Sequence, residues 1–266
     1  MPIEVSQLTP YPDINAVIHE ILSGARAVLG EDLVGMYLTG SLAAGDFDAR
    51  NSDIDFIIAT AQELSDETFT ALAEMHAHIA AGSSKWAQEI EGSYIPLEAL
   101  RRYDPANARH PHIFRGGEES RLFMMQHAGD WIIQRHVLRE HGVVVVGPSP
   151  RTLVDRVRPD DLRQAVRKLA PVWPTPLLDD PEPLRHDGYH AYTVVTLCRM
   201  LYTLEHGTVV SKPVAARWAR TAYGPRWDAL IERALAWAIR WDDVGTTLEM
   251  VRYTLARCQT TESPKA

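Results

Sequence analysis

The sequence predicts an α+β protein with two domains: an N-terminal domain with a small mixed sheet (residues 1–155) and an all-α helical bundle (residues 156–266). Apolar runs of strand length are confined to the first domain. They lie at residues 36–38, 54–58 and 143–146. In the second domain the apolar residues recur with the period of a helix. Helices are expected at residues 159–169, 188–206, 212–223, 227–241 and 243–258.

The first domain is also expected to contain helices that cover its sheet. Residues 13–29 and 63–81 carry apolar residues at helical spacing, and residues 86–96 read as a further strand ended by proline. Residues 101–121 are rich in Arg, His, Pro and Gly, which predicts a long loop. Residues 122–141 are predicted to return to helix, with Trp131 in the core.

Two further segments lack a regular apolar pattern. Residues 171–183 contain five prolines and predict a linker or irregular crossing. Residues 259–266 are polar, and we expect a disordered tail. Val143–Val146, in contrast, is apolar throughout and predicts a fully buried strand.

Composition places the chain among soluble globular proteins, with 45% hydrophobic and 23% charged residues. No apolar run reaches the roughly 18 residues of a membrane span, and no signal peptide is evident, so we expect a cytoplasmic protein without a membrane partner. We also expect a monomer. Cys198 and Cys258 lack the spacing of metal ligands and are expected to be buried thiols. The formal net charge of −8 argues against a nucleic-acid partner and suits a small cationic molecule.

Residues 36–58 carry the chemistry around which the first domain is organised. Alternation along the strand from residue 54 puts Asp53 and Asp55 on one face, about 7 Å apart at Cα, whereas Ile54 points into the core. Two carboxylates on a rigid strand suit Mg²⁺, a hard cation that takes oxygen ligands and shares them with phosphates. The strand therefore predicts a magnesium site.

The turn before this strand has the residues of a phosphate site. Gly40 allows the backbone to approach a phosphate closely, and Ser41 adds a hydroxyl near the start of a helical turn. Gly40-Ser41 is followed after eleven residues by Asp53-Ile-Asp55, and this pattern resembles the DNA polymerase β-like nucleotidyltransferase superfamily. The resemblance implies that Asp53 and Asp55 hold Mg²⁺, and that Gly40, Ser41 and Ser52 contact a nucleotide.

Enzymes of this superfamily carry a third acid on a neighbouring strand. Glu91 is our choice, because Glu91-Gly-Ser-Tyr-Ile-Pro96 resembles the corresponding strand of the aminoglycoside adenylyltransferases. Glu89 lies two residues earlier on the same predicted face and is the alternative. The resemblance implies that this acid completes the metal site or acts as general base.

The run from Val195 to Ala219 resembles the C-terminal helical domain of the streptomycin/spectinomycin 3″(9)-adenylyltransferases, and with the first motif the resemblance covers most of residues 30–260. It implies that Arg199 and Lys212 reach the phosphates of ATP and that Asp130 contacts the nucleotide. Cations beside Mg²⁺ are physically reasonable for a triphosphate.

The chain departs from this family where the drug is bound. The streptomycin-modifying members have a tryptophan in the middle loop, and residues 101–121 contain none. They also have an Asp-x-x-His ahead of the Arg-bearing helix; here Asp187-x-x-His190 lies two residues further away, and Tyr189 and Tyr192 take the corresponding positions. Spectinomycin is therefore favoured over streptomycin.

Together these features predict a Mg²⁺-dependent nucleotidyltransferase. AMP would pass from ATP to a hydroxyl of a small cationic acceptor, an aminoglycoside or aminocyclitol antibiotic, with Glu91 as the general base. One alternative is nucleotidyl transfer to a protein or a tRNA. Another is a catalytically silent nucleotide-binding module, although three convergent acids argue against a pure binder.

Overall fold

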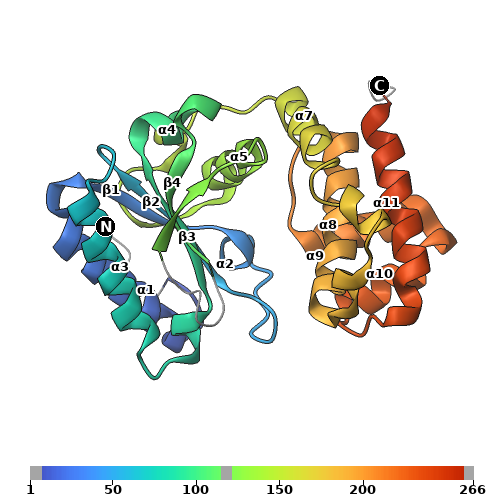
Figure 1. The fold of residues 1–266 in the computed structure, drawn as a ribbon, viewed down its shortest axis with the longest axis horizontal. Coiled ribbons are helices and arrows are strands. Elements are labelled where there is room, and N and C mark those ends of the chain that lie inside the picture. Colours follow the sequence, from blue (N-terminus) through green and yellow to red (C-terminus); the bar gives the residue numbers. More distant parts are fainter. Residues whose placement is uncertain (1–7, 115–121, 261–266) are drawn as a thin grey trace. The chain divides into compact units, whose positions relative to one another are not determined.

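The computed structural model describes residues 8–114 and 122–260. The chain divides into two compact units, Met1–Arg156 and Val157–Ala266. The first unit contains the sheet, and the second is built from helices (Figure 1). No helix among the described residues is long and apolar enough to cross a membrane.

Over the described residues, the first unit is built on a six-stranded sheet with the order β5-β4-β3-β2-β1-β6. The strands are β1 (Leu33–Leu38), β2 (Ile54–Thr60), β3 (Ile90–Pro96), β4 (Arg109–Ile113), β5 (Leu122–Gln126) and β6 (Val143–Val146). β2 and β3 run parallel, and the other neighbouring pairs are antiparallel. The predicted α+β fold, a small mixed sheet followed by a helical C-terminal part, is confirmed.

Helices cover both faces of this sheet. On one face, α1 (Pro12–Leu29) and α3 (Asp66–Ala80) pack together (Figure 1), and their apolar stripes join Phe56 in the core. α3 begins later than predicted, because Ser65 caps it by accepting a hydrogen bond from the Thr68 backbone N–H. On the other face, α5 (Trp131–His141) packs over Ile57 together with α4 (Leu97–Arg101) and α6 (Pro150–Leu153). Trp131 is buried there, as predicted.

The predicted loop at residues 101–121 and the predicted start of a helix at 122 are wrong. Arg109–Ile113 is strand β4, and Leu122–Gln126 is strand β5, which pairs with β4 at the edge of the sheet. The sequence Leu-Phe-Met-Met-Gln has no β-branched residue and suits a helix equally well, so pairing with β4 decides its state. The helix itself begins at Trp131, after Asp130.

β6 was predicted to be fully buried, but it is the other edge strand. Within Val143–Val146 only Val145 is buried, because β6 has a neighbouring strand, β1, along one of its two edges only. Edge position cannot be recognised from a continuous apolar run.

The second unit consists of helices packed around α8. They are α7 (Pro159–Leu169), α8 (Asp187–His206), α9 (Lys212–Tyr223), α10 (Asp228–Leu235) and α11 (Val244–Gln259). Four of them match the predicted ranges closely. α10 is shorter than predicted, because the chain leaves the helix at Ala236 and Trp237 has a positive φ of 52°. Cys198 in α8 is buried and Cys258 in α11 is half-buried; both are free thiols.

The proline-rich residues 171–183 lie inside the second unit and do not link the two units. They form part of two short 3₁₀ helices, Thr175–Leu178 and Glu182–Arg185, whose Leu177 and Leu184 are buried. Proline suits such short turns because its φ is already fixed. In the predicted tail, α11 continues through Gln259, and residues 261–266 lie outside the described part.

Three buried histidines stand on the sheet face that α5 covers. His110 and His112 lie on β4, and His127 follows β5 with its ring stacked on Trp131 at a centroid distance of 3.3 Å. Ser93 links two of them: its Oγ lies 2.7 Å from His112 Nδ1 and 3.4 Å from His127 Nε2. Burial lowers the pKa of His110 and His112 to about 4 and that of His127 to about 2.

We therefore predict that the protein loses stability as the pH falls below 6.5. The unfolded chain binds protons there, whereas the buried histidines stay neutral down to their lower folded pKa. Stability from this source is fully present above pH 6.5 and falls by about 1.4 kcal/mol per pH unit for each such histidine. Urea unfolding at pH 7.5, 6.5 and 5.5 measures this slope. His110→Gln should reduce the slope, and an equal slope in this variant would contradict the explanation.

Candidate functional site

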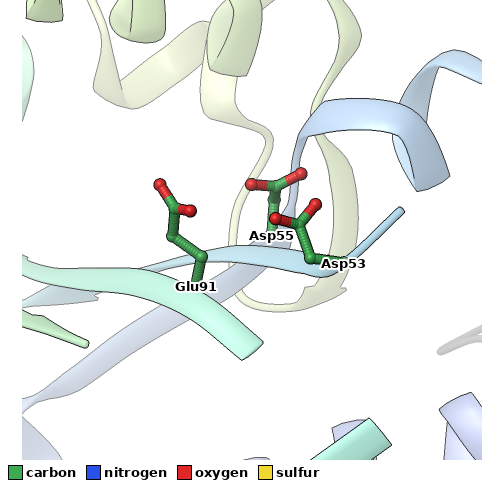
Figure 2. A group of neighbouring side chains, drawn as sticks. All are labelled: Asp53, Asp55 and Glu91. Atoms are coloured by element: carbon green, nitrogen blue, oxygen red, sulfur yellow. The ribbon is translucent and has the colours of Figure 1, made fainter. Parts of the chain in front are cut away.

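Asp53, Asp55 and Glu91 come together on the sheet face that α5 covers. Asp55 on β2 and Glu91 on β3 are direct partners in the parallel register, and Asp53 immediately precedes β2. One carboxylate oxygen from each residue lies within 4.8 Å of the other two. Figure 2 shows the three side chains rising from the same side of the two strands. All three are half-buried.

Strand alternation explains why the acids share this face. Ile54 and Phe56 are buried on the opposite side against α1 and α3, which fixes the orientation of Asp55. Three carboxylates at such short range repel one another unless protons or a cation compensate their charge. An all-oxygen donor set of this kind fits Mg²⁺.

Glu89, the alternative third acid, is not a member of this group. It follows the 3₁₀ helix Lys85–Gln88 and precedes β3, and its backbone C=O accepts a hydrogen bond of 2.8 Å from the Ile54 N–H. Its local position is therefore set by backbone pairing next to the start of the two strands.

The turn after β1 lies directly against the acids. The Thr39 N–H donates to the Asp55 C=O at 3.0 Å, and α2 (Gly40–Ala44) follows. Gly40 has a φ of +58°, and a Cβ added there would lie 1.7 Å from Asp55 Oδ2. Both the left-handed backbone and the proximity of Asp55 therefore require glycine.

Ser41 and Ser52 have different surroundings. The Oγ of Ser41 is buried and has no hydrogen-bond partner among the described residues, which suits a hydroxyl awaiting a ligand. The Oγ of Ser52 instead accepts from the Asp48 N–H at 3.0 Å, while the Ser52 N–H donates to the Asp48 C=O at 2.8 Å. Ser52 thus closes the loop that leads into β2.

Asp130 lies at the N-terminus of α5, and α5 packs against α2 on the same side of the sheet as the acids. Burial raises the pKa of Asp130, and the nearby backbone N–H groups of Asp130 and Trp131 only partly offset this effect. Of the predicted site residues, Gly40, Ser41, Ser52, Asp53, Asp55, Glu91 and Asp130 all belong to the first unit.

Arg199 and Lys212 belong to the second unit. Arg199 is half-buried in α8, and Lys212 is the first residue of α9. The Lys212 ammonium lies 4.4 Å from the centroid of the Tyr192 ring, close enough for a cation–π interaction. The Tyr192 ring in turn contacts the rings of Tyr189 and Trp173.

His190 has a structural environment. It is buried, and its Nε2 lies 2.7 Å from the Thr247 Oγ1 on α11. The Asp187-x-x-His190 pattern therefore places its histidine in the core of the helical unit. Lys212 lies over the ring of Tyr192, which stacks on Tyr189; these two tyrosines occupy the positions aligned without a gap.

Sequence reasoning missed β4 and the polar residues that it brings to the site. Ser93 lies two residues from Glu91 on β3 and therefore shares its face, and His112 is directly opposite Ser93. The alternation in His110-Pro-His112-Ile was the available signal for a strand.

The geometry around Gly40 leads to a prediction with a matched control. Gly40→Ala should destabilise the protein by more than the roughly 1–2 kcal/mol of a left-handed alanine, because Asp55 must also move. Gly45 lies at the other end of α2, with a φ of +73° and no atom within 4 Å of an added Cβ. Gly45→Ala should therefore lower the stability only by the cost of a left-handed alanine backbone. Urea unfolding measures both; equal losses would show that Asp55 accommodates the methyl group.

The comparisons with known proteins agree with this geometry. The family description "Aminoglycoside adenylyltransferase, C-terminal domain" matches residues 152–257. The chain is 27% identical over 217 residues to an aminoglycoside (3″)(9) adenylyltransferase of Rhizobium radiobacter, covering 78% of this chain and 76% of the relative. It is 25% identical over 206 residues to a spectinomycin 9-adenylyltransferase of Staphylococcus aureus, covering 75% of each.

A solved structure has the same fold. The spectinomycin adenyltransferase AAD(9) from Enterococcus faecialis, determined with ATP and spectinomycin, superposes with a TM-score of 0.67. The match covers 92% of this chain and 99% of that structure, at 19% sequence identity. These comparisons agree with one another: the chain is similar in sequence to the aminoglycoside (3″)(9) and spectinomycin 9-adenylyltransferases, and it shares the fold of a spectinomycin adenyltransferase.

Proposed function

We propose that the protein is an adenylyltransferase that transfers AMP from ATP to a hydroxyl of an aminocyclitol or aminoglycoside antibiotic. The observation that carries this proposal is the group of Asp53, Asp55 and Glu91, with carboxylate oxygens within 4.8 Å of one another, directly beside the Gly40 turn. Relatives named as aminoglycoside (3″)(9) and spectinomycin 9-adenylyltransferases support the reaction class, and the ATP-bound AAD(9) structure supports ATP as co-substrate.

Asp53 and Asp55 are the proposed ligands of Mg²⁺. Their carboxylates and that of Glu91 fit the ion, because hard oxygen donors converge at one point of a rigid sheet. When bound, Mg²⁺ would neutralise charge on the phosphate oxygens and stabilise the charge that develops during transfer.

Glu91 is the proposed general base. It takes the proton of the acceptor hydroxyl, whose oxygen attacks the α-phosphorus in line; the bond from this phosphorus to the bridging oxygen breaks, and pyrophosphate leaves. β3 holds Glu91 beside Asp55 through the parallel register, so its carboxylate stands next to the place where the nucleotide is bound.

The nucleotide is proposed to lie along the turn after β1. Gly40 permits close approach of the phosphates, and the buried Ser41 Oγ is a candidate donor to a phosphate oxygen. Ser52 contributes by fixing the loop before β2, and Asp130 lies on the same side of the sheet. Arg199 and Lys212 are proposed to supply positive charge to the triphosphate, as the family resemblance implies.

Spectinomycin is the proposed acceptor in preference to streptomycin. The streptomycin-type Asp-x-x-His pair is replaced at the aligned positions by Tyr189 and Tyr192, and His190 is committed to Thr247 in the core. We further propose that the enzyme acts as a monomer, since one chain supplies the whole acid group, and in the cytoplasm, where ATP is available.

A pyrophosphate-release assay tests the function. The protein is incubated with ATP and Mg²⁺ and one of several acceptors, including spectinomycin and streptomycin, and the product is identified by mass. We expect pyrophosphate and an adenylylated product with spectinomycin, less or none with streptomycin, and no product when EDTA removes the metal. Absence of product with every aminocyclitol and aminoglycoside would overturn the proposal and favour a macromolecular acceptor or a binding role.

Glu91→Gln is expected to slow AMP transfer at least about a hundredfold, the usual scale for loss of a general base, with ATP binding nearly unchanged. Glu89→Gln is the matched control, because this residue lies two positions away but outside the acid group. Single-turnover kinetics and calorimetric titration with ATP separate the two effects. If Glu89→Gln is the slow variant and Glu91→Gln is not, the base has been assigned wrongly.

A further inference from the structure

The exposed apolar side chains of the first unit gather on a single hairpin. Among its described residues, the large hydrophobic side chains with substantial exposure are Phe114 at 50%, Phe123 at 40% and Met124 at 40%. Phe114 directly follows β4, and Phe123 and Met124 lie on β5. Exposed aromatic side chains gathered in this way mark binding surfaces more often than isolated ones do.

The sheet register puts two of them on the face that carries the acids. Glu91 and Ser93 share one face of β3, and His112 is directly opposite Ser93. On the next strand, Phe123 is directly opposite His112, and their rings meet edge to face at 5.8 Å. Phe123 therefore stands on the Glu91 side of the sheet.

Phe114 directly follows the end of β4. Its ring is 5.9 Å from that of His112, on the same side of the sheet. The register pairs Ser93 with His112 and Gly92 with Ile113, and Phe114 and Glu91 are the residues that adjoin the last of these pairs. Met124 has the opposite orientation: it pairs with Pro111, between the positions that face the acids.

His112 forms a fixed floor between the two phenylalanines. It is buried, its Nδ1 lies 2.7 Å from the Ser93 Oγ, and its ring meets that of Trp131 at 6.3 Å. Its Nε2 has no hydrogen-bond partner among the described residues. The aromatic surface is thus anchored to the same strand that positions Glu91.

The order of the strands separates the two substrates. Read across the sheet, the phosphate-binding turn follows β1, the acids lie on β2 and β3, and the aromatic surface lies on β4 and β5. The turn and the aromatic surface are therefore on opposite sides of the acid group. In-line transfer needs the attacking hydroxyl and the leaving pyrophosphate on opposite sides of the phosphorus.

We propose that Phe114 and Phe123, over the floor formed by His112, are the acceptor-binding surface of this enzyme. The apolar face of the acceptor's saturated ring packs against these aromatic rings. The ammonium groups of the acceptor lie over the faces of the aromatic rings in cation–π interactions, and the acceptor's hydroxyl is thereby presented to Glu91. The assignment rests on the proposed adenylyl transfer and adds the residues that select a small, cationic, cyclic acceptor.

Steady-state kinetics with spectinomycin and ATP test the proposal. Phe123→Ala and Phe114→Ala should each raise the KM for spectinomycin about tenfold, with the KM for ATP unchanged within about twofold. Phe123→Tyr keeps an aromatic face and should restore acceptor affinity. Met124→Ala is the matched control, since the residue has the same exposure on the same strand and faces away; it should leave the KM for spectinomycin unchanged.

Urea unfolding of the variants shows whether a loss reflects folding. If the wild-type enzyme adenylylates spectinomycin but Phe123→Ala and Phe114→Ala keep the wild-type acceptor KM, the aromatic surface is not the acceptor site and the proposed function still stands. If the KM for ATP rises instead, the surface binds the nucleotide and the proposal is also overturned. If the wild-type enzyme modifies no acceptor, the proposed function and this inference both fail.

Discussion

The site depends on the close contact between the turn after β1 and the carboxylate of Asp55. A Cβ on Gly40 would lie 1.7 Å from Asp55 Oδ2, so the turn and the acid can share this space only because residue 40 has no side chain. The same contact is reinforced by the backbone hydrogen bond from Thr39 to Asp55. Because of this contact, the candidate phosphate site at the turn lies directly beside the candidate metal site at Asp55.

The parallel pairing of β2 and β3 supplies the third acid. In a parallel pair with a regular register, residues at matching positions lie side by side, and here these residues are Asp55 and Glu91. The core on the opposite face, with Phe56 packed between α1 and α3, prevents either strand from slipping by one residue. A slip would send both carboxylates into the core, so hydrophobic packing enforces the arrangement of the acids.

The face beyond Glu91 combines buried polar groups with exposed aromatic ones. His112 and Ser93 are linked beneath Phe114 and Phe123, and the histidines stay neutral because burial lowers their pKa. A neutral floor beside three carboxylates keeps the local charge negative, which suits a cationic acceptor. This edge of the sheet is the surface that we propose for the acceptor.

The sequence alone was enough for the strand alternation that aligns Asp53 with Asp55, the Gly-Ser turn, and the helical character of the second unit, because each follows from a local period or motif. It also pointed to Glu91 through resemblance. Only the tertiary structure decided that residues 109–113 and 122–126 are paired edge strands, that residues 171–183 pack inside the second unit, and that His190 is a core residue. These outcomes depend on partners distant in sequence, and a local pattern of side chains carries no information about which partner is present.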